Sequence, residues 1–516
     1  MNRKISFTTL GLLLLVFLLS VLVRMPNINR PLSKHHEFVT GLSVRIVQIM
    51  YEDGAVQHAF NPITNYNGLA NKNINNHAST TGTMVNSEGN YFYVSHPPFA
   101  YMLPYAVHKA LHIKPTVLSI QIFHLCINFL TALFVYFIIC LLGQQKPLGK
   151  VYISALIGFI VYLFNPAVLW FQCNTYMSDM LVHFFFVLGV YTMLKLLMRK
   201  RFFSPKYLII YAIVLFLMIY TSWLGLFFAF SVFVYSLLKL RFEKVFLPLV
   251  FITMGITFFS LALIVWQASQ IGGTQAYIIQ MLDRFGERGS FGGNGIGFAL
   301  LAKLKAFGTV LFGFVTSYLP VFLLMGTFGW LVITKAKLRI VFTKNGYRFL
   351  WLSTLPVVLL HLSLMNYAGH DFVNLYASLF FAVLIAILYD KLRQANTLPR
   401  TILNGGVVIV VLLSLGMYYY INRPGEYSMK GDYYAEAKEI GEYIQQDAKD
   451  DEVVFFIQSN DVYVEPQVVL YAQRNIERVV SEQEAIDILI ERDFLHGILY
   501  QVDENHQIFG QRIIAN

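Results

Sequence analysis

The chain has 516 residues, of which 56% are hydrophobic and 13% are charged. A soluble protein of this length carries about twice that charged fraction. Apolar runs long enough to cross a bilayer recur almost to the end of the chain, so the composition excludes a soluble globular protein and predicts a polytopic membrane protein. The formal net charge of +10 lies largely in short links between apolar runs, and we therefore expect no nucleic-acid partner.

The basic links predict the membrane topology. Stretches such as "MRKRFFSPK" and "TKAKLRIVFTKNGYR" are typical of cytoplasmic loops. The basic and then apolar N-terminus lacks a small-x-small cleavage site, so we interpret it as a retained first helix that starts in the cytoplasm. We expect a multi-pass protein of the cell inner membrane with about eleven transmembrane helices, at 7–23, 118–142, 150–169, 180–197, 206–220, 222–238, 245–267, 310–334, 348–365, 371–389 and 402–421.

Two polar segments between these spans are expected outside the cytoplasm. The first outer loop covers 24–96 and the second covers 268–309. The segments 97–113 and 296–309 are apolar enough to approach the membrane, but they would break the charge rule if they crossed it. We therefore predict that both lie along the outer surface as juxtamembrane helices.

The C-terminal tail, 422–516, has a different composition, with charges restored and shorter apolar runs. "DYYAEAKEIGEYIQQDA" has helical spacing, "EVVFFIQ" reads as a buried strand, and Ser481 and Glu484 have the spacing of a capping box at a helix N-terminus. "HGILYQV" and "QIFGQRII" predict two final strands. The tail is expected to form a small α/β extracytoplasmic domain after an all-α membrane domain at 1–421.

Two motifs of the first outer loop contain residues that can carry chemistry. In "RPLSKHHEF", Glu37 could act as a general base for an acceptor, oriented by His35 or His36, although a solvated loop acid has the same appearance. In "YFYVSHPPFAY", the prolines favour a helix start, which would place His96 where a helix N-terminus attracts anions.

Three later charged residues are also candidates. Asp179 lies at the edge of an apolar run, where an acid is costly and usually functional. Arg284 and Arg288 are four residues apart and share one face if the segment is helical, so they could bind a phosphate. An ordinary charged interfacial helix would have the same spacing.

In this order, the motifs resemble the membrane-embedded GT-C glycosyltransferases, in particular the protein O-mannosyltransferases and the aminoarabinose transferases that modify lipid A. The resemblance rests on an acid soon after the first helix, a long loop, and "SHPPF". It continues with "NPAVLWFQCNTYMSDMLVHFFF" (165–186) and "NYAGHDFVNLYASLFFAVLIA" (366–386). These matches are spread over roughly residues 1 to 400 and leave out the tail.

The resemblance implies a polyprenyl-phosphate sugar as donor and a single inverting displacement. Glu37 would be the base. The family often has Asp-Glu and uses the aspartate, whereas this chain has His36 at that position, so His36 is the alternative. Asp179 would be a second acid near the acceptor or a metal. The remaining assignments are donor phosphate contacts at His96, Arg284 and Arg288, and walls of the substrate site at His370, Asp371, Tyr93 and Tyr101.

The acceptor implied is a glycolipid, a polysaccharide or a protein, and the sugar is not readable. Glu37, Asp179 and nearby histidines could bind a divalent metal, although no ligand spacing requires one. The alternatives are a secondary transporter or lipid flippase of cell-envelope glycolipids, an O-antigen polymerase or ligase, and a scaffold that presents the tail. A transporter would be expected to show repeats with broken helices in matching positions, and no such repeat is visible.

Overall fold

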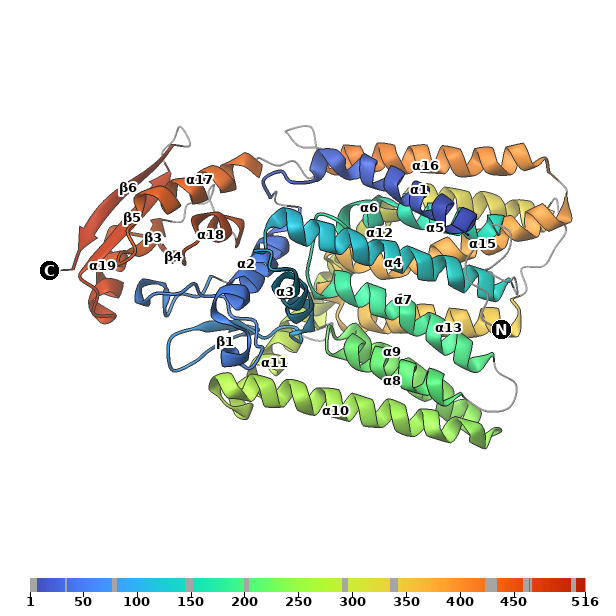
Figure 1. The fold of residues 1–516 in the computed structure, drawn as a ribbon, viewed down its shortest axis with the longest axis horizontal. Coiled ribbons are helices and arrows are strands. Elements are labelled where there is room, and N and C mark those ends of the chain that lie inside the picture. Colours follow the sequence, from blue (N-terminus) through green and yellow to red (C-terminus); the bar gives the residue numbers. More distant parts are fainter. Residues whose placement is uncertain are drawn as a thin grey trace.

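The computed structural model describes residues 7–32, 35–76, 81–143, 152–198, 204–289, 296–334, 342–396, 398–422, 434–457, 464, 466–502 and 507–515. Most of the long helices run side by side as a bundle (Figure 1). The bundle helices are α1 (Phe7–Arg24), α4 (Val117–Leu142), α5 (Ile153–Leu163), α6 (Pro166–Phe171), α7 (Ser178–Leu197), α8 (Pro205–Ile219), α9 (Leu224–Leu240), α10 (Leu247–Gly272), α12 (Ile296–Thr334), α13 (Lys344–Ser363), α15 (Ser378–Ala395) and α16 (Arg400–Asn422).

The predicted membrane class is confirmed. Among the described residues, seven helices are long and apolar enough to cross a bilayer. Each of the eleven expected spans overlaps a helix, but α5, α8 and α9 are shorter than a usual crossing, so the number eleven stays a prediction. The seven spans are Phe7–Asn27, Val117–Leu142, Ser178–Leu197, Lys244–Gly272, Leu300–Thr334, Asp371–Ala395 and Arg400–Ile421.

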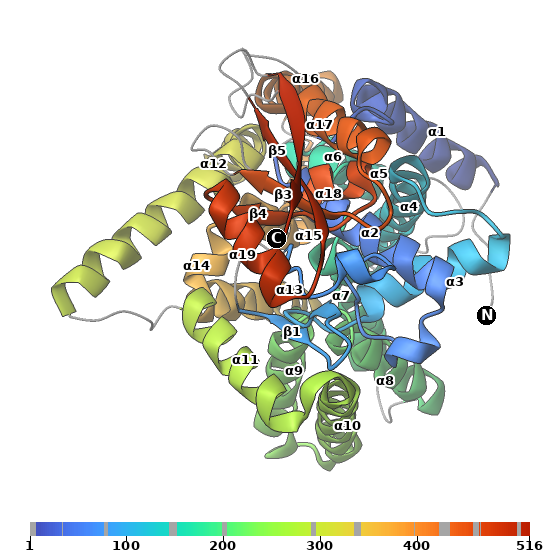
Figure 2. The ribbon, with the colours of Figure 1, turned by 90° about the vertical axis from the view of Figure 1, so that its left-hand side faces the viewer.

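The two segments expected as juxtamembrane helices behave differently. The first is a separate helix, α3 (Phe99–Leu111), as predicted from its prolines; its position along the membrane stays a prediction. The second is continuous with α12, a helix of 39 residues and therefore about 58 Å long. This length exceeds the roughly 30 Å of a bilayer core, and the first turns of α12 project sideways from the bundle (Figure 2).

The first loop, the tail and α11 (Thr274–Arg288) gather at one end of the bundle, which we call the loop end (Figure 1). The loop contains α2 (Glu37–Asp53), a helix that the sequence did not predict. It also contains a hairpin of β1 (Thr83–Val85) and β2 (Tyr91–Tyr93), whose turn is held by the Asn86 side chain. Short 3-10 turns at Met25–Asn27, Val56–His58, Leu69–Asn71, Lys244–Phe246 and Asp371–Ala377, and the short helix α14 (Met365–Ala368), complete the connections.

The tail forms the predicted small sheet with helices. The strand order is β4 (Glu477–Val479), β3 (Val453–Ile457), β5 (His496–Val502) and β6 (Ile508–Ile514). β3 is parallel to β4 and β5, and antiparallel pairing in this sheet is between β5 and β6. Ser481 accepts a hydrogen bond from the Glu484 backbone, as its capping position predicted. The elements are α17 (Tyr434–Asp447), β3 (Val453–Ile457), α18 (Pro466–Ala472), β4 (Glu477–Val479), α19 (Glu482–Glu491), β5 (His496–Val502) and β6 (Ile508–Ile514).

The tail packs directly on the first loop. Ala70 and Ile74 of the loop belong to the same buried cluster as strands β3 and β5. The Tyr66 backbone N–H donates to Asn475, and the Leu32 backbone N–H donates to the Tyr471 hydroxyl over 2.9 Å. The tail therefore fixes the loop that carries Glu37.

At Gly41, α2 and α18 lie in close contact. A Cβ atom there would lie 3.1 Å from the Gln467 backbone nitrogen and 3.2 Å from the Pro466 carbonyl carbon. We expect Gly41→Ala to lower the free energy of unfolding by roughly 1–3 kcal/mol, because the added methyl group would press on the α18 backbone. Alanine normally favours a helix, so the loss would not come from helix propensity. A thermal melt with Gly255→Ala as control checks this, because nothing lies within 4 Å of a Cβ at Gly255. An unchanged Gly41→Ala melt would contradict tight docking of the tail.

Candidate active site

Glu37 is the first residue of α2 and is almost completely buried, with 1% of it exposed. Arg30 Nη1 donates to Glu37 Oε2 over 3.0 Å, and Asn174 Nδ2 donates to Oε1 over 3.0 Å. Asn174 also donates to the Asn27 carbonyl, which ties the turn after α1 to the same site. Because both oxygens receive a donor and the helix N-terminus favours an anion, the carboxylate is held in one orientation.

Asp179 is buried at the start of α7 and is bound by two tyrosines. The Tyr367 hydroxyl donates to Oδ2 over 2.6 Å, and the Tyr376 hydroxyl donates to Oδ1. Ser178 adds a third hydrogen bond. The tyrosines come from α14 and the following 3-10 turn, so Asp179 joins α7 to the segment that the sequence singled out at 366–386.

A cavity of about 740 Å³ lies next to Tyr367, between α9, α10, α11 and α13. Its wall is mainly apolar and includes Trp223 directly before α9, Phe227 from α9 and Ile264 from α10. Its polar residues include Ser95, His96, Arg284, Arg288, Ser363, Tyr277 and Tyr367. Such a site suits a ligand with a long apolar part and an anionic group.

His96 is held at this cavity by its neighbours in the chain. The Ser95 carbonyl accepts from Trp223 Nε1 over 2.8 Å, and the Ser95 hydroxyl accepts from Arg284 Nε over 2.7 Å. Pro98 is the N-cap of α3, so His96 lies two residues before the N-cap and not at the helix N-terminus where the sequence placed it. Within the described part of the chain, its buried Nδ1 has no hydrogen-bond partner. A ligand atom in the cavity could supply one.

Burial lowers the pKa of His96 to about 4, so its imidazole is neutral at pH 7. Since an unfolded histidine titrates near 6.5, this group favours folding above pH 6.5 and loses that contribution as the pH falls toward 4. At pH 5 this loss is roughly 2 kcal/mol of the free energy of unfolding, and we expect His96→Gln to remove it. Thermal melts of both proteins between pH 7.5 and 5 measure this. Parallel pH profiles would contradict a neutral buried His96.

The two arginines of α11 differ in their surroundings. Arg284 is buried and bonded to Ser95, Thr81 and Glu287, so its charge has a carboxylate partner 2.7 Å away. Arg288 lies over the Tyr367 ring, 4.8 Å from its centroid. Among the residues that the structure describes, Arg288 forms no ion pair, which makes it the better candidate for an anionic ligand.

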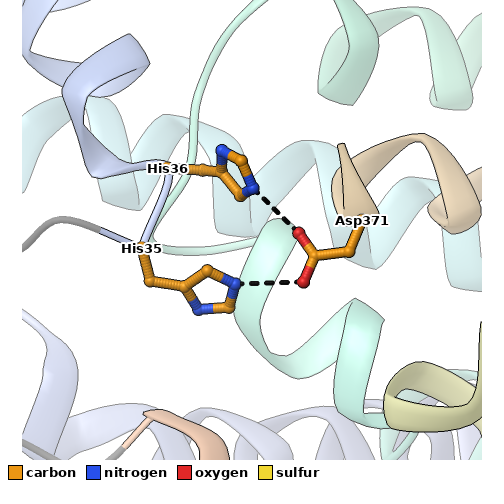
Figure 3. Close-up of side chains that lie close together, drawn as sticks. All are labelled: His35, His36 and Asp371. Carbon is orange, nitrogen blue, oxygen red and sulfur yellow. Dashed lines mark hydrogen bonds and ion pairs between the residues drawn. The ribbon is translucent and has the colours of Figure 1, made fainter. Parts of the chain in front are cut away.

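A second polar cluster contains His35 and His36, the two residues that precede Glu37 in the chain. His35 Nε2 lies 3.2 Å from Asp371 Oδ2, and His36 Nε2 lies 2.9 Å from Asp371 Oδ1 (Figure 3). The three donor groups lie within 4.8 Å of one another, which is a spacing that a metal ion could bridge. The His370 ring stacks on Phe372 and lies 5.5 Å from the His36 ring.

The structure thus brings most predicted residues to the loop end, in two neighbouring groups. His96, Arg284 and Arg288 line the cavity, and Tyr367 connects them to Asp179 and to His370. The predicted wall residues Tyr93 and Tyr101 are buried and do not line the cavity; the Tyr93 ring lies 6.1 Å from that of His96 and 6.5 Å from that of Tyr101.

Sequence reasoning missed Arg30, Asn174, Tyr367 and Tyr376. Asn174 lies inside 165–186, and Tyr367 and Tyr376 lie inside 366–386, so two of the segments that carried the family resemblance marked the right places. No periodicity in the sequence distinguishes these residues from the many other tyrosines and asparagines. Their contacts join residues between 7 and 197 positions apart in the chain.

Comparisons with known proteins identify the fold. No protein-family model matches the chain, and no curated protein is similar in sequence. ArnT from Cupriavidus metallidurans, bound to undecaprenyl phosphate, has a TM-score of 0.56 at 11% identity, over 96% of this chain and 93% of that one. A second neighbour is the archaeal oligosaccharyltransferase AglB from Archaeoglobus fulgidus, in complex with an inhibitory peptide and a dolichol-phosphate. Its TM-score is 0.53 at 10% identity, and the match covers 96% of this chain and 69% of that one. The Archaeoglobus fulgidus oligosaccharyltransferase complex with Zn and sulfate has a TM-score of 0.52 at 10% identity. That match covers 95% of this chain and 67% of the other.

These neighbours are membrane glycosyltransferases of the GT-C class. The chain therefore has the fold of these ArnT and oligosaccharyltransferase structures, and the fold that the sequence motifs implied is confirmed. At this level of identity the likeness establishes the architecture alone.

Proposed function

We propose that this protein is a glycosyltransferase that moves a sugar from a polyprenyl-phosphate donor to an acceptor bound at the loop end. The observation that carries the proposal is the apolar cavity that includes His96, Arg284 and Arg288 among its polar lining residues. An isoprenoid chain needs an apolar groove, and its phosphate needs cations and hydrogen-bond donors. The ArnT and AglB structures hold undecaprenyl phosphate and dolichol-phosphate, which are ligands of this kind.

In the proposed reaction, Glu37 accepts a proton from the acceptor's hydroxyl or amine. The oxygen or nitrogen of that group attacks the anomeric carbon of the donor sugar at the same time. The bond between that carbon and the phosphate oxygen breaks, and the lipid phosphate leaves with the electron pair. Attack from the face opposite the phosphate inverts the anomeric configuration. Arg30 and Asn174 keep the Glu37 carboxylate in one orientation, which is what a general base requires.

The departing phosphate gains negative charge as the bond breaks. Arg288 and Arg284 supply positive charge at the cavity, and His96 supplies a hydrogen-bonding nitrogen. Asp179 is a positioning residue in this scheme, because its bond to Tyr367 fixes the ring on which Arg288 lies. The leaving group therefore departs toward the cavity while the acceptor approaches from the Glu37 side.

The charge pattern supports one membrane orientation. The basic links connect helices whose described ends lie away from the loop end (Figure 1), and the positive-inside rule favours a cytoplasmic location for that side. We propose that the helical bundle lies in a cell inner membrane and that the loop end and the tail lie outside the cytoplasm. No nucleotide sugar is needed there, because the lipid phosphate is the leaving group.

The test is sugar transfer by the purified protein in detergent. Undecaprenyl and dolichyl phosphates that carry labelled sugars are offered with glycolipid, polysaccharide and peptide acceptors. We expect label to move to one acceptor class and free polyprenyl phosphate to appear in equal amount. No transfer from any lipid-linked sugar would overturn the proposal, and a flipping assay in proteoliposomes would then test the transporter alternative.

A further inference from the structure

A second, smaller cavity lies where the tail meets the bundle, and we call it the tail cleft. Its lining residues come from the turn after α1, from α2, from the start of α4, and from α17, α18 and the residue after α18. α18 packs on α2, and α17 packs on α18 (Figure 1). We propose that the tail cleft binds a neutral sugar unit of the acceptor, so that the acceptor is a carbohydrate. This inference rests on the proposed function and names its acceptor class.

The tail cleft adjoins the candidate base. Arg30 and Tyr471 both line it, and Arg30 Nη1 donates to Glu37 Oε2 over 3.0 Å. The Tyr471 hydroxyl accepts from the Leu32 backbone N–H over 2.9 Å, which ties it to the segment that leads to Glu37. Glu37 itself does not line the cleft, and the described linings of the cleft and of the larger cavity share no residue. The cleft would therefore hold a unit of the acceptor next to the unit that reacts.

The lining of the tail cleft is mainly polar, unlike that of the larger cavity. An amide side chain offers both a hydrogen-bond donor and an acceptor, as each hydroxyl group of a sugar does. Peptides are usually bound along a sheet edge or in an apolar groove, and the tail cleft is neither. Its volume of about 310 Å³ suits a short saccharide. The amide residues of the lining are Asn29, Gln48, Gln445 and Gln473.

The charges of the tail cleft are balanced. Arg30 pairs with Glu37 over 3.0 Å, and Lys438 pairs with Glu442 over 3.5 Å. Each basic side chain in the described lining of the cleft thus has a carboxylate partner. A phosphate group would find little surplus positive charge here, in contrast to the cavity that contains Arg288. The cleft therefore suits the hydroxyl groups of a neutral sugar.

Gln473 has a backbone conformation that favours a different residue. It follows α18 with a left-handed φ of 49°, at a position where helices commonly end on glycine. A glutamine is less favourable there, because its Cβ atom crowds the neighbouring carbonyl oxygen. Its side chain lines the tail cleft, and residues in such conformations concentrate at ligand sites. Glycine at this position would relieve the crowding and remove the amide, so effects on stability and on binding can be separated.

The test is the KM for the acceptor, measured at saturating lipid-linked donor with a glycolipid, a polysaccharide and an unglycosylated peptide. We expect transfer to the glycolipid or to the polysaccharide, and the better of the two identifies the source of the sugar. Gln445→Ala and Gln473→Gly should each raise the acceptor KM by about 3- to 10-fold, the effect of losing one hydrogen bond between neutral groups. The donor KM should stay unchanged. Gln473→Gly should melt no lower than wild type, because glycine adopts the left-handed conformation readily.

Two matched controls separate the cleft from its surroundings. Gln446→Ala changes the next residue of α17, which is exposed and does not line the cleft. Asn396→Gly changes an exposed amide with a φ of 52° directly after α15. Both controls should keep the wild-type acceptor KM.

The outcomes distinguish this inference from the proposed function. If wild type transfers sugar only to the peptide, or if a folded variant with both Gln445→Ala and Gln473→Gly keeps the wild-type acceptor KM, the role of the cleft is overturned and the proposed function stands. If wild type transfers nothing from any lipid-linked sugar, the proposed function fails and this inference fails with it.

Discussion

Glu37→Gln is expected to lower kcat/KM for sugar transfer by between about 10² and 10⁴, the usual contribution of a general base. Glutamine has nearly the same volume and can still accept a hydrogen bond from Arg30, but it cannot take a proton from the acceptor. The measurement is the initial rate of transfer at saturating donor, with the acceptor varied.

Glu52→Gln is the matched control. Glu52 lies on the same helix, is largely exposed and pairs with Lys114 over 2.8 Å, so its replacement should leave the rate unchanged. Because Glu37→Gln removes the carboxylate that Arg30 binds over 3.0 Å, some loss of thermal stability is expected as well. Glu37→Asp restores the charge and should recover stability and part of the rate. If folded Glu37→Gln transfers as fast as wild type, the base is another group, and His36→Asn is the next variant to test.

Arg288→Gln is expected to lower kcat/KM for the lipid-linked donor by about 10- to 100-fold. A hydrogen bond to a charged group contributes about 1.5–3 kcal/mol, and each 1.4 kcal/mol is a factor of ten in affinity. Most of the loss should appear as a higher donor KM, since the donor phosphate is already anionic before the reaction. Inhibition by free polyprenyl phosphate should weaken by a similar factor.

Arg241→Gln is the control for this variant, because Arg241 is an exposed cation at the other end of α9 from the cavity residue Trp223. Its donor KM should match that of wild type. Arg284→Gln is expected to cost stability as well as affinity, since Arg284 also holds Ser95 and Thr81. An unchanged donor KM in Arg288→Gln would mean that the phosphate does not bind at this end of the cavity.

The tail shows how local signals predict structure. α17, β3, α19, β5 and β6 were each predicted from apolar spacing or a capping residue, because those signals act within a few positions. α18 and β4 were missed, since α18 is only 7 residues and β4 only 3, too short for a period to be recognised. α2 was missed for another reason. Its apolar residues are not confined to one face, because the helix is buried on most sides by α18, α3 and α4.

By itself, the sequence determined the membrane class, the approximate helix spans, the α/β tail and the segments that carry Glu37, His96, Asp179 and the arginines, because hydropathy, charge and capping are local properties of the chain. Only the tertiary structure decided that Arg30 and Asn174 hold Glu37, that Tyr367 links Asp179 to the cavity, and that Asp371 lies between His35 and His36. Several of these contacts join positions more than a hundred residues apart. Their geometry depends on how the helices pack, and no pattern within one segment records it.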